Sequence, residues 1–89
     1  MKVNSTRSLF VVVGHTGTYE DVTSWNVSAS RNVHKANDLR DRLNAWCKER
    51  GLDASHNGIV RNPEKPAEDP QFVCFDGTTY TVEEIPDLD

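Results

Sequence analysis

The sequence predicts an α+β fold of the order β-β-α-β-β, in which an antiparallel sheet has one amphipathic helix packed on one face. Three observations lead to this prediction. Two strand-like runs, residues 9–13 and 22–29, flank a short glycine loop; residues 33–50 follow with apolar side chains at helical spacing; and two further strand-like runs, within residues 72–82, flank Asp76-Gly77. The 89 residues suffice for one small domain with a single core.

The first strand is apolar on both sides, which is typical of a central strand. Leu9, Val11 and Val13 share one side, and Phe10 and Val12 share the other. If the helix covers one face of the sheet, we expect Phe10 and Val12 to lie partly exposed on the opposite face. A second copy or a partner would then cover them.

The second strand alternates as a half-buried strand does. We expect its tryptophan and its other apolar-side residues to face one way; these are Thr23, Trp25, Val27 and Ala29. Gly14 and Gly17 turn the chain between the two strands. Because this loop is too short for a parallel crossover, the strands should pair antiparallel.

The helix is predicted from a single apolar stripe, with Ser30 or Asn32 as its N-cap and Gly51 as its left-handed stop. Both tryptophans, Trp25 and Trp46, lie on the apolar sides of their elements and should be core residues. The stripe consists of Val33, Ala36, Leu39, Leu43, Trp46 and Cys47.

Turn residues and prolines dominate residues 53–71, which predicts a surface loop with a brief strand at Ile59-Val60. Residues 1–7 are expected to form a flexible N-terminus, and residues 86–89 an acidic tail.

Asp76-Gly77 is a strong two-residue hairpin signal. It predicts that the last two strands pair with each other across this turn. In that register the opposing residues would be Phe75 and Thr78, Val73 and Tyr80, and Gln71 and Val82.

The sequence favours a soluble, cytoplasmic protein without a membrane segment. No apolar run approaches the ~20 residues needed to span a bilayer, and the polar N-terminus does not read as a signal peptide. Only Cys47 and Cys74 are present, which favours a reducing compartment. A redox pair is the alternative to two small buried hydrophobic residues, and we favour the latter.

The charge is unevenly distributed. Residues 1–50 hold eight Lys/Arg and five Asp/Glu, whereas residues 51–89 hold two Lys/Arg and nine Asp/Glu. Such asymmetry suits steering toward a charged protein partner, and the acidic half opposes direct nucleic-acid binding.

No catalytic or cofactor signature is complete. The loop Gly14-His-Thr-Gly-Thr18 lacks the Gly-Lys-Ser/Thr ending of a phosphate loop. His15, His34 and His56 lack the close partners that metal sites require, and His34 lies about 20 Å along the helix from Cys47. We therefore expect neither an enzyme nor a bound cofactor or metal.

The adjacent acidic pairs indicate a solvated surface, because neighbouring residues in a strand point to opposite faces. The alternative is that the C-terminal acids form a patch for a basic partner, and that the aromatic first loop supplies an anchor. The candidate partner-binding residues are His15, Thr18, Tyr19, Glu20, Asp21, Glu83, Glu84 and Asp87.

Residues 10–29 read Phe-Val-Val-Val-Gly-His-Thr-Gly-Thr-Tyr-Glu-Asp-Val-Thr-Ser-Trp-Asn-Val-Ser-Ala, and Leu-Asn-Ala-Trp follows at 43–46. Asp69-Pro70 and the sequence Tyr80-Thr-Val-Glu83 close the chain. This order resembles a class of short accessory proteins of tailed bacteriophages, although the first loop reads Gly-His-Thr-Gly here and residues 53–71 depart from the pattern. The resemblance brings no catalytic residues with it.

The resemblance implies a phage-encoded factor that acts in the host cytoplasm by stoichiometric binding to a host protein, such as a CRISPR or other defence complex. The expected contact is the sheet face, the first loop or the acidic C-terminal patch. The alternative is a homodimeric structural or assembly component of the phage particle.

Overall fold

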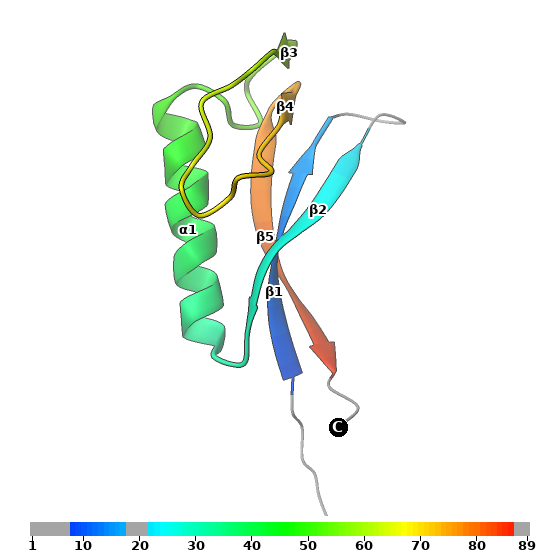
Figure 1. Cartoon of the computed structure of the whole chain (residues 1–89), viewed down its shortest axis with the longest axis vertical. Helices are drawn as coiled ribbons and strands as arrows, with labels where there is room; N and C mark the ends of the chain where they lie inside the picture. The colour runs from blue at the N-terminus through cyan, green and yellow to red at the C-terminus, as the bar shows by residue number, and fades with distance from the viewer. Residues whose placement is uncertain (1–7, 18–21, 87–89) are drawn as a thin grey trace, which may run out of the picture.

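The computed structural model describes residues 8–17 and 22–86 of the chain. One helix lies beside a long twisted sheet (Figure 1). The predicted N-terminal segment, residues 1–7, lies outside the described residues, as do residues 87–89 of the predicted acidic tail. The elements are β1 (Ser8–Thr16), β2 (Thr23–Ser30), α1 (Val33–Glu49), β3 (Ile59–Val60), β4 (Cys74–Phe75) and β5 (Thr78–Pro86).

The main sheet has three strands in the order β2-β1-β5, and both pairs are antiparallel. The predicted pairing of the first two strands is confirmed, and β1 is the central strand. It pairs with β5 along its whole length, from Ser8 opposite Pro86 to Thr16 opposite Thr78. The α+β fold class is confirmed.

The ends of α1 follow from local chemistry. The Asn32 side chain accepts the backbone N–H groups of His34 at 2.9 Å and Lys35 at 3.3 Å, so Asn32 is the N-cap. At the other end Gly51 has a φ of +69°, the left-handed conformation expected after a helix. Five of the six residues of the predicted stripe face the core. Ala36, Leu43 and Cys47 are buried in it, and Leu39 and Trp46 pack against it, whereas Val33 does not belong to this cluster.

A β-bulge changes which residues of β2 share a face. Val12 lies opposite Ser28 but Val13 lies opposite Asn26, so Val27 is an extra residue in the ladder. Trp25 and Val27 pack against the core, whereas Ala29 pairs with Val11 on the other face. The prediction that Ala29 shares a face with Trp25 is therefore wrong.

The side of β1 that faces α1 is the opposite of the one predicted. Val12 is only 1% exposed and belongs, with Phe10 at its margin, to the core under α1. Leu9, Val11 and Val13 are on the face away from the helix. Val11 and Val13 are nevertheless buried, between neighbours from β2 and β5.

The turn at Asp76-Gly77 is present, but the hairpin is not. Both residues have positive φ, +62° and +92°, as a two-residue hairpin turn requires. However, β4 pairs with β3, and β5 pairs with β1, so the predicted strand pairing and its register are wrong. The two donors that a hairpin would pair bond elsewhere: the buried Thr16 hydroxyl accepts the Phe75 N–H at 2.7 Å, and the Leu52 carbonyl accepts the Thr78 N–H at 2.9 Å.

The long connection between α1 and β5 is largely exposed, as predicted, and includes the predicted strand at Ile59–Val60. It is anchored at a few buried points, among them Pro66, Asp69 and Phe72. Figure 1 shows it passing in front of the space between α1 and the sheet. Among the described residues, no helix has the length and apolar content of a membrane span.

Candidate functional site: the free edge of β5 and a groove beside the helix

The outer edge of β5 is closed over its first half. Successive residues of an antiparallel strand direct their backbone groups alternately to the two sides. On the side away from β1, the Thr78 N–H donates to the Leu52 carbonyl at 2.9 Å. Two residues on, the Asn44 side chain accepts the Tyr80 N–H at 2.8 Å and donates to the Tyr80 carbonyl at 3.0 Å. Asn44 therefore occupies the position that a neighbouring strand would take.

The second half of this edge is open. By the same alternation, the N–H and C=O groups of Val82 and Glu84 point away from β1. Within residues 8–17 and 22–86, these outward groups have no protein hydrogen-bond partner. We call residues 82–86 the open β5 edge.

The side chains of the open β5 edge are acidic and apolar. Glu83, Glu84 and Ile85 are all exposed, and Ile85 exposes 46% of its surface. Glu84 accepts a hydrogen bond of 2.7 Å from the Ser8 hydroxyl. Neither glutamate forms an ion pair with any residue that the structure describes. Both negative charges are thus available to a cationic partner.

His15 lies on the face of the sheet away from α1. Its imidazole bridges the outer strands, with Nδ1 at 3.0 Å from the Ser24 hydroxyl and Nε2 at 2.8 Å from the Thr81 hydroxyl. These contacts fix the ring against the sheet, and the result is a polar, hydrogen-bonded surface at this end of the molecule.

The structure does not bring the described candidate residues into one patch. His15 pairs with Thr79, whereas Glu83 pairs with Val11, four residues away along β1. At about 3.3 Å per residue this separation is about 13 Å. The other candidates, Thr18, Tyr19, Glu20, Asp21 and Asp87, lie outside the described residues.

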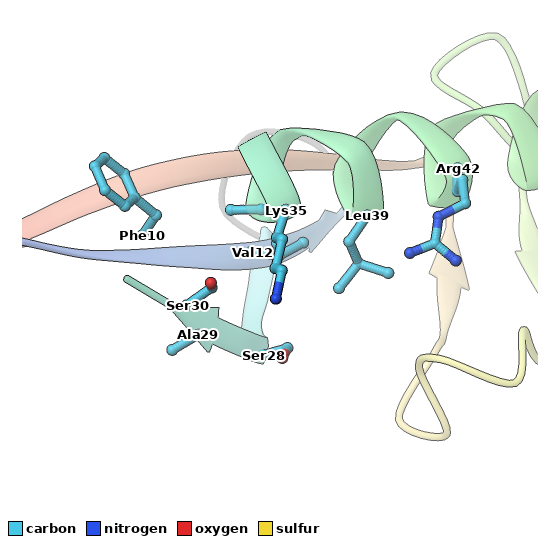
Figure 2. Close-up of a pocket in the computed structure, with 9 residues that line it drawn as sticks. Phe10, Val12, Ser28, Ala29, Ser30, Lys35, Leu39 and Arg42 are labelled. Atoms are coloured by element: carbon cyan, nitrogen blue, oxygen red, sulfur yellow. The ribbon is translucent and has the colours of Figure 1, made fainter. Parts of the chain in front are cut away.

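A groove that sequence reasoning missed lies between α1 and the β1–β2 pair (Figure 2). Its cavity volume is about 280 Å³. We call it the α1–β2 groove. Its apolar lining residues are Phe10, Val12, Ala29, Ala36 and Leu39, of which Val12 and Ala36 are almost fully buried.

Polar and cationic side chains surround this apolar surface. Ser28 and Ser30 lie on the β2 side, and Lys35 and Arg42 on the helix side. Figure 2 shows Lys35, Leu39 and Arg42 extending from α1 toward β2. The helical spacing of these three was visible in the sequence, but the strand residues that complete the groove were not.

The cysteines are packing residues, as predicted. Cys47 and Cys74 are free thiols with no exposed surface. Burial, reinforced by the neighbouring Cys74 and by the carboxylates of Asp53 and Asp69, raises the pKa of Cys47 to about 12. This thiol is therefore neutral and inaccessible at physiological pH, the opposite of an activated nucleophile.

Residues 8–17 and 22–86 contain no group of three or more His, Cys, Asp or Glu side chains arranged to bind a metal ion. The described residues offer several surfaces for contact, and the open β5 edge and the α1–β2 groove are the two developed below; a further groove of about 550 Å³ lies beside β3 and β4. Comparisons of the chain with known protein families, with curated proteins and with solved structures found no match.

Proposed function

We propose that this protein is a non-enzymatic, stoichiometric protein-binding factor that adds an extended basic segment of its partner to the open β5 edge. The observation that carries the proposal is the contrast along one strand. Asn44 closes the edge at Tyr80, while the outward backbone groups of Val82 and Glu84 remain without a protein partner in the described chain.

Backbone pairing explains the affinity of such a contact. Val82 and Glu84 together offer two donors and two acceptors, which an added strand satisfies about 4.8 Å away. An exposed strand edge is a template for pairing with another chain, and proteins usually protect it. Here the protection by Asn44 ends at mid-strand.

Charge explains the choice of partner. Glu83 and Glu84 project to opposite faces of the strand, so a segment paired here has a glutamate on each face. Lysine or arginine at neighbouring positions would form cross-strand pairs worth a few tenths of a kcal/mol to about 1 kcal/mol each. A second copy of β5 would bring glutamates against glutamates, which disfavours self-pairing.

The resemblance to phage accessory proteins supports a host protein as the partner, in the host cytoplasm, and a CRISPR or other defence complex as its class. The alternative is that the protein is a homodimeric structural or assembly component, and it would then be part of the phage particle. Mass spectrometry of purified virions separates the two, because an inhibitor would be scarce there.

Co-purification with matched variants tests the proposal. The tagged protein, the variant Glu83→Lys/Glu84→Lys and the control Asp41→Lys/Glu49→Lys are incubated with host lysate under gentle conditions. The control makes the same charge change at exposed positions of α1. We expect a host protein to bind the wild type and the control but not the edge variant.

Recovery of no host protein, or equal recovery with all three proteins, would overturn the proposal. For a recovered partner, amide hydrogen exchange gives a second readout. Binding should slow exchange at Val82 and Glu84, the two outward N–H groups, more than at Thr81 and Glu83, which bond to β1 in the free protein.

A further inference from the structure

The α1–β2 groove combines an apolar surface with positive charge and has no acidic side chain in its lining. Phe10, Val12, Ala29, Ala36 and Leu39 form the apolar part, and Val12 and Ala36 belong to the buried core. The walls are therefore held by the sheet and the helix, so a ligand would not have to order them.

The two cationic side chains of the groove, Lys35 and Arg42, differ in whether they already form ion pairs with this chain. Arg42 forms an ion pair of 3.0 Å with Glu68 and another of 3.5 Å with Asp38, so carboxylates of this chain already neutralise it. Lys35 forms no ion pair or side-chain hydrogen bond with any described residue. Lys35 is thus the charge that an incoming carboxylate would meet.

Volume decides the kind of occupant. Sites for drug-sized ligands have about 300–1,000 Å³, and the groove, at about 280 Å³, lies just below that range. A space of this size suits one large side chain. Insertion of one large apolar side chain into such a space is the usual role of an anchor residue in a protein interface.

We propose that the α1–β2 groove receives an acidic segment of a protein partner, which inserts one large apolar side chain over Phe10 and Leu39 and pairs an adjacent carboxylate with Lys35. This inference goes beyond the proposed function, because it assigns a second contact surface with the opposite charge preference. It does not depend on whether the open β5 edge binds a strand.

Glu84 sets the orientation of that segment. It pairs with Phe10 from the β5 side, while Ser30 pairs with Phe10 from the β2 side, so one end of the groove approaches a negative charge. The carboxylate of the partner should therefore lie on the Lys35 side of the inserted side chain, away from Glu84. Ser28, opposite Val12, can donate a hydrogen bond to the same carboxylate.

The test uses the acetylated, amidated peptide Ser-Asp-Phe-Asp-Ser as the probe and the isotope-labelled full chain as the target. We expect saturable chemical-shift changes at Phe10, Val12, Lys35 and Leu39 in the amide spectrum. Replacing the phenylalanine of the probe with serine should abolish them. Replacing both aspartates with asparagine should weaken binding about tenfold, equivalent to about 1.4 kcal/mol.

Variants of the protein locate the charge. Lys35→Met keeps the aliphatic stem and removes the ammonium, and Lys35→Glu reverses the charge; we expect losses of about tenfold and more than tenfold. Lys48→Glu, also an exposed lysine of α1 but outside the groove lining, is the control and should bind as the wild type does. Unchanged amide spectra away from position 35 show that each variant is folded.

Three results with the peptide probes would overturn the proposal. They are the absence of saturable shifts at millimolar probe, equal binding to the wild type and Lys35→Glu, and equal binding of the aspartate and asparagine probes. Phenylacetate, a free apolar acid, is titrated in parallel. If it binds as tightly as the peptide, the groove is a site for small carboxylates, and the peptide assignment is wrong.

Discussion

The indole N–H of Trp25 donates to the carboxylate of Asp69 at 3.0 Å, and this bond fastens the long connection to the sheet. The same carboxylate oxygen accepts the Tyr80 hydroxyl at 2.7 Å, and the other oxygen accepts the Gln71 N–H at 3.2 Å. Asp69 is only 1% exposed. Burial, together with the bond to Asp69, raises the pKa of Tyr80, so its hydroxyl remains a donor over the physiological range.

Asp69→Ala should lower the free energy of unfolding by at least about 2 kcal/mol. It leaves the buried Tyr80 hydroxyl and the Trp25 N–H without their acceptor, and each such group costs about 1–3 kcal/mol. Urea unfolding followed by tryptophan fluorescence measures the loss. The control is Glu68→Ala, which removes only an exposed pair with Arg42 and should cost less than about 1 kcal/mol. Equal losses in the two variants would show that Asp69 does not fasten the connection.

Gly14 leaves room for the ring of Trp25. A Cβ at Gly14 would come within 2.9 Å of three indole atoms, and the ring is held in place by Asp69 and by an edge-to-face contact with Tyr80. We therefore expect Gly14→Ala to destabilise the protein by about 1–3 kcal/mol through overpacking. In a Trp25→Leu background the same substitution should cost much less. A double-mutant cycle by urea unfolding measures the difference, and an equal cost in both backgrounds would contradict the steric explanation.

Asn44 protects the edge of β5 at Tyr80 with two hydrogen bonds. Asn44→Ala should cost about 1–2 kcal/mol and speed hydrogen exchange of the Tyr80 amide to the rate of the open β5 edge. Asn44→Asp should also destabilise, because it sets a carboxylate oxygen against the Tyr80 carbonyl. Asn37→Ala on the same helix is the control, since its side chain makes no hydrogen bond within the described residues. Slow exchange of Tyr80 in Asn44→Ala would refute the protective role.

Local chemistry made part of the fold predictable. The Asn32 cap, the Gly51 stop and the Asp76-Gly77 turn each depend on residues close in sequence, and all three are present. The pairing across that turn was not predictable in this way. It depends on two residues outside this segment: the Thr16 hydroxyl accepts the Phe75 N–H and the Leu52 carbonyl accepts the Thr78 N–H, and a hairpin would have used both donors. The sequence of residues 72–82 alone does not indicate these distant hydrogen-bond partners.

The candidate site likewise has some features that were predictable from local sequence and others that depend on long-range contacts. Glu83 and Glu84 were identifiable as exposed acids, but their place on an open edge follows from β5 pairing with β1 on one side only. The α1–β2 groove joins a helix face to Phe10 from the central strand, and the prediction had placed Phe10 on the opposite face. The extra residue at Val27 likewise moved Ala29 to the other face. These errors all concern long-range register, which alternation alone does not fix.

The buried thiol of Cys47 makes stability fall at alkaline pH. Burial raises its pKa from 9.0 to about 12, so the unfolded chain loses this proton near pH 9 while the folded chain keeps it. The contribution is therefore complete below pH 9 and is lost as the pH rises through about 12. The free energy of unfolding falls by at most about 1.4 kcal/mol per pH unit over this range.

Cys47→Ala should be less stable than the wild type at pH 7, because it leaves a small cavity, but should lose less stability between pH 9 and 10. Urea unfolding at both pH values, with reductant present, measures the two slopes. Parallel slopes would mean that Cys47 ionises as readily in the folded protein as in the unfolded chain.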